Sequence, residues 1–565
     1  MNNSHTMKKA FLLSLIILAF GGISKAQKDS VVLIKANEPT ISDAFKINDN
    51  PRINDTTVEK LNLNYHINPK LYPTTFDVDP IKPAKMTGEP LVKLYRAFIK
   101  AGFGTKTTPL AEIDYDNLRS TTSAFGFYYD HLSSSGKIKN YGYPGFSDNK
   151  AGVDAKRFYR QHTFTADIDY TRNVVHYYGF NKNVYDTLPD YPNLSKKDSI
   201  KQRFAKIGGK FNFFSTYKDS TKLNHAFSLQ YYHLSDLYNA SENYINFSAS
   251  ADEKVNFLGR TVKNQNLGLA AMIDDYDDVN KTDTGNAAVI QFVPHFSAKG
   301  DIIKFNMGFN TSISTGKSSI TYLYPDLSID FNLYNNIFIL YGGLTGGLQR
   351  NNLIDFSAEN PFINTSLPLE FTNTKTKLFG GFKGSLSSKF SFDASVYDAT
   401  IDNMPLFVND TSIVSCPLQN KFTVVYDNVQ VFNSHIELAF QKSTKINVAL
   451  SADYFQYTTT RQLKAWHQPS SDVCLSFNYN LRDKIILKAD VFARGSSYAR
   501  TFAGNVPEAT SLKGVVDFNL GMEYRYSKIW SAFINFNNVA AVRYQQWYNY
   551  PNYGFTALVG LTYSF

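Results

Sequence analysis

The densest group of side chains that could do chemistry is a run of acidic residues in the middle of the chain. Asp274, Asp275, Asp277 and Asp278 surround a single tyrosine, Tyr276. Hard cations such as Ca²⁺ bind through several carboxylate oxygens, so these four aspartates are the metal-site candidates of the sequence. Their spacing matches no calcium-binding loop motif. We therefore interpret the run as a hydrated loop rim and predict no metal site.

The two cysteines of the chain, Cys416 and Cys474, are too few for a disulfide framework or a four-ligand zinc site. Cys474 has the same parity as Ser476 and Asn478 in a predicted strand, and Cys416 falls in a predicted long loop. In an oxidising compartment a loop that folds inward would let the two thiols form a disulfide. The alternative is two free thiols.

Motifs of common enzyme classes are missing from the sequence. The ten histidines are scattered and form no HExxH pair. We find no G-x-S-x-G nucleophile elbow, no phosphate-binding P-loop and no glycine-rich dinucleotide turn after a strand. We predict that the chain is not an enzyme and carries no cofactor.

Alternation of apolar and polar residues runs through most of the chain. In residues 446–454 and again in 518–526 every second residue is apolar, and small or polar residues stand between them. Successive side chains of a strand point to opposite faces, so each run has one apolar and one polar face. The polar-face residues that we expect to line an interior lumen are Asn447, Ser451, Asp453, Asn519, Glu523 and Arg525.

Length and composition indicate which β-architecture must carry these strands. The chain has 565 residues, of which 15% are aromatic and only 19% charged. Its mean hydropathy is −0.29, and beyond residue 26 no apolar run is long enough for a membrane-spanning helix. The strands of a soluble β-sandwich or propeller also alternate between apolar and polar residues. Such a protein would rarely need so many strands with one apolar, aromatic-rich face. We predict an all-β fold, a transmembrane antiparallel outer-membrane β-barrel over residues 92–565.

Connector lengths give the strand number and the two ends of the barrel. Short polar turns such as 299–301, 387–389 and 482–483 are predicted to face the periplasm, and longer segments are predicted to face outward. A boundary near Arg172–Asn173 separates two strands, unless one long strand replaces them. This division predicts about 22 strands, with about 18 to 22 allowed. The predicted outer loops are 134–160, 182–200, 278–285, 351–371, 401–420, 459–468, 495–513 and 541–552.

Aromatic residues recur in these outer loops, where they could contact a ligand. Tyr and Trp also form the interfacial girdles of such barrels, so we interpret them as girdle or loop-packing residues. They are Tyr141, Tyr143, Phe146, Tyr191, Trp466, Trp547 and Tyr548.

The N-terminal residues predict export. Residues 1–26 have the charged start, the apolar run and the small residues before a cleavage site of a secretory signal peptide. Residues 27–91 are rich in proline, which cannot donate to a strand ladder, and we interpret them as a periplasmic segment or a short lumen insert. The net charge of +9 is spread over the chain without a basic stripe, so we predict no nucleic-acid partner.

The last residues of the chain predict a barrel strand that ends at the C-terminus. From 553 to 565 the apolar and small residues alternate, and the pattern ends on Tyr563 and Phe565. We interpret Tyr563 and Phe565 as a C-terminal signal for the barrel-assembly machinery, and outer-membrane lipid as the contact of the apolar face.

The stretches 517–539 and 543–565 resemble the C-terminal part of the barrel of TonB-dependent receptors, and 93–112 resembles the first hairpin of a related, plug-poor group. The resemblance implies an outer-membrane location and solute uptake, passage or surface binding through a polar lumen. It also implies TonB or a surface lipoprotein as a partner. Only 27–91 precedes the barrel, which is too short for the plug domain of that family. The alternative is a scaffold barrel with a sealed lumen that recruits partner proteins.

Overall fold

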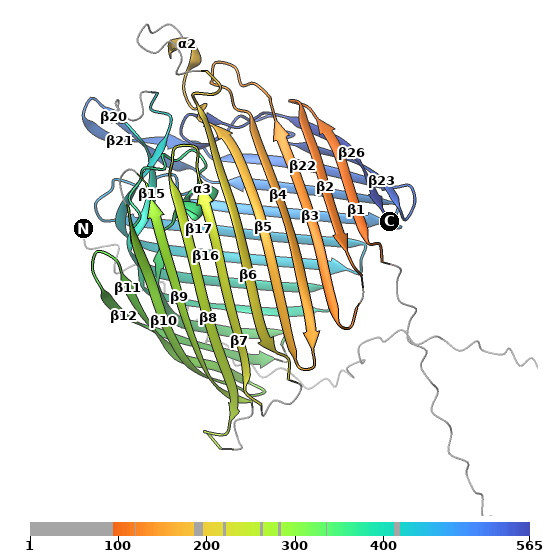
Figure 1. The fold of residues 1–565 in the computed structure, drawn as a ribbon, viewed down its shortest axis with the longest axis vertical. Coiled ribbons are helices and arrows are strands. Elements are labelled where there is room, and N and C mark those ends of the chain that lie inside the picture. Colours follow the sequence, from red (N-terminus) through yellow and green to blue (C-terminus); the bar gives the residue numbers. More distant parts are fainter. Residues whose placement is uncertain are drawn as a thin grey trace, which may run out of the picture. The chain divides into compact units, whose positions relative to one another are not determined.

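The described residues of the computed structural model form one closed ring of antiparallel strands. They are 94–118, 120–185, 196–217, 222–259, 264–280, 284–334, 336–411 and 418–565, and the predicted signal peptide and the segment 27–91 lie outside them. Within these residues 22 strands are joined to their neighbours in sequence order, and the last pairs with the first (Figure 1). The predicted all-β barrel and its strand number are confirmed. Among the described residues, no helix is both long and apolar enough to cross a membrane.

The ring consists of β1 (Ala97–Gly104), β2 (Thr108–Asp116), β3 (Ser123–Ser134), β4 (Phe146–Tyr159), β5 (His162–His176), β6 (Lys201–Ser215), β7 (Asn224–Ser235), β8 (Ser241–Val255), β9 (Gln265–Val279), β10 (Thr284–Lys299), β11 (Ile303–Thr315), β12 (Ile320–Tyr334), β13 (Phe338–Arg350), β14 (Phe371–Ser387), β15 (Phe390–Asn409), β16 (Phe422–Lys442), β17 (Ile446–Thr459), β18 (Ser471–Leu481), β19 (Ile485–Arg494), β22 (Val515–Arg525), β23 (Trp530–Asn537) and β26 (Thr556–Ser564). Connecting segments contain α2 (Lys182–Tyr185), α3 (Leu353–Glu359) and two small hairpins, β20 (Ser497–Ala503) with β21 (Val506–Leu512) and β24 (Gln545–Trp547) with β25 (Tyr550–Pro551).

The ring closes at the seam between β1 and β26. Phe98 lies opposite Ser564, and the pairing continues to Gly104 opposite Leu558. The carbonyl oxygen of Phe565 accepts hydrogen bonds from the backbone N–H of Arg96 at 2.8 Å and of Ala97 at 2.9 Å. The last residue of the chain therefore takes part in closing the barrel, while its role as an assembly signal stays a prediction.

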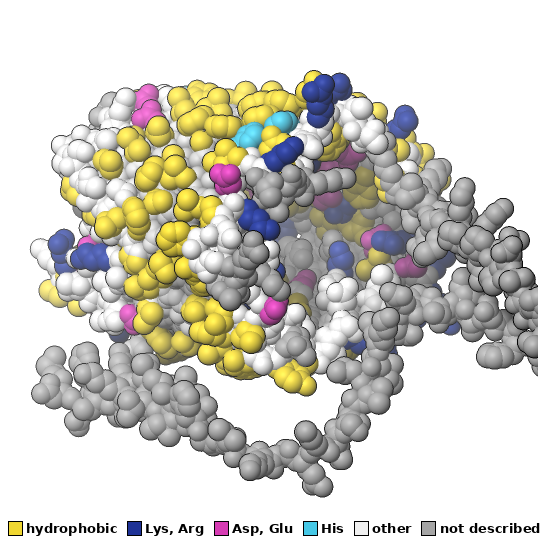
Figure 2. Space-filling view, turned by 90° about the horizontal axis from the view of Figure 1, so that it is seen from below, with side chains coloured by type: hydrophobic (Ala, Val, Ile, Leu, Met, Phe, Trp, Pro, Cys, Tyr) yellow, Lys and Arg dark blue, Asp and Glu magenta, His cyan; other side chains and the backbone are white. Residues whose placement is uncertain are grey.

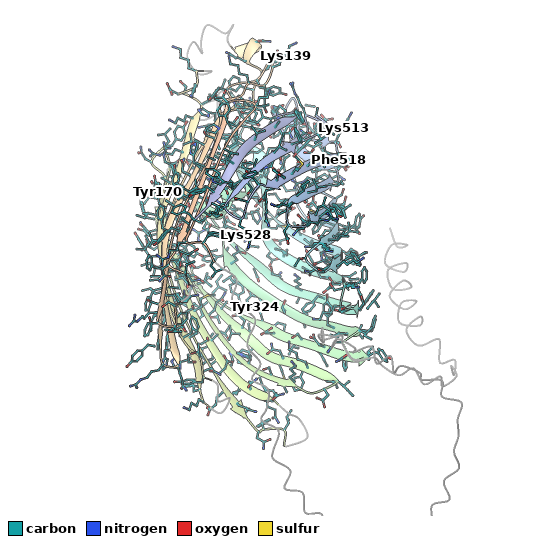
Figure 3. The ribbon with its side chains drawn as sticks, turned by 90° about the vertical axis from the view of Figure 1, so that its right-hand side faces the viewer. Lys139, Tyr170, Tyr324, Lys513, Phe518 and Lys528 are labelled. Carbon is teal, nitrogen blue, oxygen red and sulfur yellow. The ribbon has the colours of Figure 1, made fainter. Side chains whose placement is uncertain are left out.

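Outward-facing side chains are apolar along the strands. Phe518 and Tyr170 lie on the outer side of the ring and are each 42% exposed, whereas Tyr324 on the inner side is only 3% exposed (Figure 3). Hydrophobic side chains cover most of the outer wall in Figure 2, and charged side chains gather at its ends and inside the hollow on the right. This distribution suits a wall with lipid outside and water inside.

Two of the predicted boundaries that bear on the strand number differ from the structure. Residues 146–159 of the predicted loop 134–160 form β4, and β5 runs without a break through Arg172 and Asn173. β4 was not recognised because its outward residues, such as Ala151 and Val153, are small, while its inward residues include Lys150 and Asp154. One missed strand and one superfluous boundary cancel, which is why the number of strands is still correct.

Candidate functional site

The inner wall near the end of the barrel that holds the C-terminus carries charges of both signs. Glu523 accepts hydrogen bonds from Arg525 Nε at 3.2 Å and from Ser531 Oγ at 3.0 Å. Lys100 and Glu112 form an ion pair of 2.8 Å on the same wall. Lys100, Glu112, Glu523 and Arg525 line a recess of about 300 Å³. Asn519, another predicted lumen residue, lies farther along β22 and accepts a hydrogen bond from the backbone N–H of Asn538.

The predicted lumen residues of β17 occupy one face of that strand. Asp453 accepts from Asn433 at 3.2 Å and lies 2.9 Å from His435 Nδ1. Ser451 is opposite Cys474, and Asn447 is opposite Asn478. The inner wall is therefore polar here as well.

Cys474 is half-buried, and its sulfur lies 3.9 Å from Ser476 Oγ. Its predicted disulfide partner Cys416 lies outside the described residues, so the pairing stays a prediction.

The acidic run was predicted to be a loop rim, but it lies in strand β9. Asp274 and Asp278 are buried on the inner face, whereas Asp275 and Asp277 belong to the opposite, outward face. Asp274 accepts hydrogen bonds from Tyr244 Oη and Asn246 Nδ2, and Asp278 pairs with Arg350 at 2.9 Å. The described residues contain no group of three or more His, Cys, Asp or Glu side chains that could hold a metal ion.

A group of loops folds into the end of the barrel opposite the C-terminus. We define the loop cap as residues 351–370, which include α3, together with 465–467 and 545–551. In Figure 1, α3 lies among the strand ends on the same side as β20 and β21, away from the C-terminus. The predicted loop aromatics Trp466 and Trp547 are buried in this region, at 0% and 7% exposed. Loop packing is therefore the role of these two residues, while Tyr191 lies outside the described residues.

One apolar cluster connects the loop cap with distant parts of the wall. It includes Leu234 of β7, Ile363 of the cap and Phe422 of β16. β7 and β16 are nine places apart in a ring of 22 strands, so they stand on nearly opposite sides of the barrel. A cluster that contains both must span the mouth. The other cluster members are Phe204, Tyr232, Ala240, Leu353, Phe356, Leu367, Leu369, Phe407, Val424, Trp547 and Tyr550.

Polar contacts at three consecutive cap residues reach the same two sides. The carbonyl oxygen of Ile363 accepts from Tyr177 Oη at 2.8 Å, next to the end of β5. The backbone N–H of Asn364 donates to the carbonyl of Phe422 at 2.7 Å. Thr365 Oγ1 donates to Asp236 Oδ2 at 2.6 Å, in the connection between β7 and β8. The cap is thus tied across the lumen by both apolar and hydrogen-bonded contacts.

The start of α3 is held by buried charged groups of the wall. Glu242 Oε2 accepts from the backbone N–H of Leu353 at 2.6 Å, and Asn352 caps the helix through Asp355 N at 2.8 Å. A buried ion pair joins Arg350 and Asp278 beside them, with side chains 5% and 4% exposed. This arrangement could not be predicted from the sequence, because it joins residues 72 and 111 positions apart.

His467 is a titratable group buried among the loops, and it lies against Trp547 with 5.1 Å between ring centres. Its Nδ1 lies 3.0 Å from the carbonyl of Phe407, and its Nε2 accepts from the backbone N–H of Tyr548 at 3.3 Å. Burial lowers the pKa of His467 to about 4.

We expect acid to loosen the cap through His467. The open state would bind the proton near the ordinary histidine pKa of about 6.5, so stability is lost as pH falls from there towards about 4, by about 2 kcal/mol at pH 5. Hydrogen exchange of the cap amides at pH 7 and pH 5, corrected for intrinsic rates, measures this loss. His467→Asn is the matched control, because asparagine does not titrate and tolerates the φ of 58° at this position. Equal pH dependence in both proteins would contradict the assignment.

Comparisons with known proteins identify solved structures with a similar fold. No protein-family model and no curated protein matches the chain. Among solved structures, the chain is similar to the siderophore receptor PirA from Acinetobacter baumannii, with a TM-score of 0.62 and 11% identity over 84% of this chain and 81% of that chain. It is similar to the FrpB iron transporter from Neisseria meningitidis, with a TM-score of 0.63 and 9% identity over 84% and 82%. For the pyoverdine outer membrane receptor FpvA from Pseudomonas aeruginosa PAO1 the TM-score is 0.61, with 12% identity over 84% and 79%.

At these identities the likeness concerns the fold, and it agrees with the closed ring, the apolar outer wall and the polar inner wall. The chain is a closed, 22-stranded antiparallel β-barrel whose fold is similar to that of these solved structures.

Proposed function

We propose that this chain is an outer-membrane receptor-type barrel that admits a solute from the cell surface, and that the loop cap is its closed state. The proposal rests on where the barrel is closed, which is at the mouth that the loop cap crosses. Apolar packing is concentrated where the loops cross the mouth, whereas the described inner wall towards the periplasm is lined by charged and polar side chains. A barrel closed by loops alone can open when those loops move.

The similar structures support the same role. PirA is described as a siderophore receptor and FrpB as an iron transporter. For this chain we propose uptake, passage or surface binding of a solute, without chemical conversion of it. We place the barrel in outer-membrane lipid, inserted by the barrel-assembly machinery, with TonB or a surface lipoprotein as its partner.

Locking the loop cap tests whether it moves. Asn364 Nδ2 of the cap lies 3.0 Å from Oδ2 of Asp410, the residue directly after β15. We expect Asn364→Cys/Asp410→Cys, in a Cys416→Ser/Cys474→Ser background, to form a disulfide between cap and wall. In planar bilayers under applied voltage, the cysteine-free parent should show brief openings. Oxidised variant protein should show none, and reduction should restore them.

The scaffold alternative makes a different prediction for the same experiment. A sealed barrel would give no openings in the parent, so oxidation and reduction would change nothing. Thiol titration of the variant shows whether the disulfide has formed. Silence of both proteins, with the disulfide formed, would contradict gated passage and favour the scaffold.

A further inference from the structure

The end of the barrel that carries the loop cap also has an open pocket of about 760 Å³. No residue of the apolar cluster that spans the mouth lines this pocket. Four separate loops line it. They contribute Phe180 after β5, Asn409 and Gln419 from the connection of β15 and β16, Arg500 and Phe502 from the β20–β21 hairpin, and Tyr548 and Asn549 from the β24–β25 turn. The hairpin projects at the end away from the C-terminus, so the pocket lies at the proposed cell-surface side (Figure 1).

Arg500 gives the pocket an uncompensated positive charge. It is the one charged residue among those that line the pocket, and in the described part of the chain it has no ion pair. Its Nε is buried without a hydrogen-bond partner, and its guanidinium lies 5.5 Å from the ring centre of Phe502. Burial lowers the pKa of Arg500, with no carboxylate to offset that effect. A guanidinium in this state favours an anionic group of a ligand, such as a carboxylate.

The remaining lining is rich in amides and aromatic rings. Asn181, Asn409, Gln419, Asn505 and Asn549 all border the pocket. Asn409 is only 7% exposed, and its Oδ1 has no hydrogen-bond partner. An amide side chain both donates and accepts, as a sugar hydroxyl does, and the flat faces of Phe502 and Tyr548 suit the apolar face of a pyranose ring.

We propose that this pocket binds an acidic saccharide, with Arg500 on the sugar carboxylate, the amides on its hydroxyls and the aromatic side chains against its ring. The inference rests on the proposed function, because that function places the pocket at the cell surface. It does not require the barrel to open.

The test uses purified full-length protein and tri-galacturonic acid, with its methyl ester as a probe of the same shape but without charge. Calorimetric titration should show binding of the acid, and weaker binding of the ester. Arg500→Met should lower the affinity for the acid by about tenfold or more, because a charge-assisted hydrogen bond is lost. Lys389→Met, on an exposed turn between β14 and β15, should leave the affinity unchanged.

A second variant keeps the test decisive if Arg500→Met disturbs the hairpin. Asn505 is exposed at the hairpin tip, so Asn505→Asp adds a negative charge to the pocket without disturbing packing, and it should weaken binding of the acid more than of the ester. Absence of binding, equal affinity for acid and ester, or citrate binding as tightly as the trisaccharide would each overturn the proposal. The conductance experiment is independent, so a saccharide result does not decide whether the cap moves.

Discussion

Replacing residues 353–367 with a short glycine–serine turn is expected to convert a closed barrel into a steadily conducting one. These residues supply four members of the apolar cluster, including Phe356 and Ile363, and the hydrogen bonds from the cap to Tyr177, Asp236 and the backbone of Phe422. Without these residues, α3 no longer links β7 to β16 through the apolar cluster. The ring itself keeps every strand pairing. Barrels with fewer strands already hold an aqueous channel, so an uncapped ring of this size should conduct strongly.

The measurement is single-channel conductance in a planar bilayer, on chains with and without residues 27–91. Shortening of the β20–β21 hairpin is the matched control, because its strands contribute no residue to the cluster that spans the mouth, and it should leave the barrel closed. Steady current only after removal of both 353–367 and 27–91 would mean that the N-terminal segment also closes the lumen. Silence of the doubly shortened chain would refute the assignment of the closure to the loops.

A second large effect is expected for Arg350→Met. Arg350 Nη2 lies 2.9 Å from Asp278 Oδ2, its Nη1 donates to the carbonyl of Asn351, and Glu242 interacts with the Asp278 carboxylate. Removal of the guanidinium leaves two carboxylates buried together beneath the start of α3. Breaking one partner of a buried ion pair costs about 3–5 kcal/mol, and we expect that loss in the free energy that holds the cap on the wall.

Hydrogen exchange of the amides of 353–369 measures this free energy. Lys375→Met is the control: Lys375 pairs with Asp402 at 2.7 Å but is 54% exposed, so its loss should cost less than about 1 kcal/mol. Arg350→Met/Asp278→Asn should recover part of the loss, because one buried charge is removed. Equal effects of Arg350→Met and Lys375→Met would show that the buried pair does not anchor the cap.

The barrel could be predicted from the sequence because lipid and water impose a pattern on every strand. Residues 518–526 show this directly, since the apolar positions are the outward ones. The same alternation would have divided the acidic run correctly, because Asp274 and Asp278 share a parity that Asp275 and Asp277 do not. The interpretation of that run as a loop is therefore the error, since a strand with this parity separates the two pairs of aspartates.

The loop cap could not be predicted in this way. Its contacts join residues such as Tyr177 and Ile363, which are 186 positions apart and belong to no repeating pattern. The aromatic loop residues were a signal that the loops pack, but alternation gives no information about which loop meets which wall. The pocket around Arg500 depends on the same long-range arrangement, since four loops have to meet before its lining exists.

The seam between β1 and β26 has a consequence for biogenesis. The first and last strands of the ring are each other's neighbours, so the final pairing joins residues more than 450 positions apart. A nascent or truncated chain that lacks β26 keeps two unpaired strand edges, which are templates for aggregation and targets for proteases. Contacts between such distant residues also form slowly. Ring closure therefore works as a checkpoint on synthesis: only chains that include β26 can pair both edges.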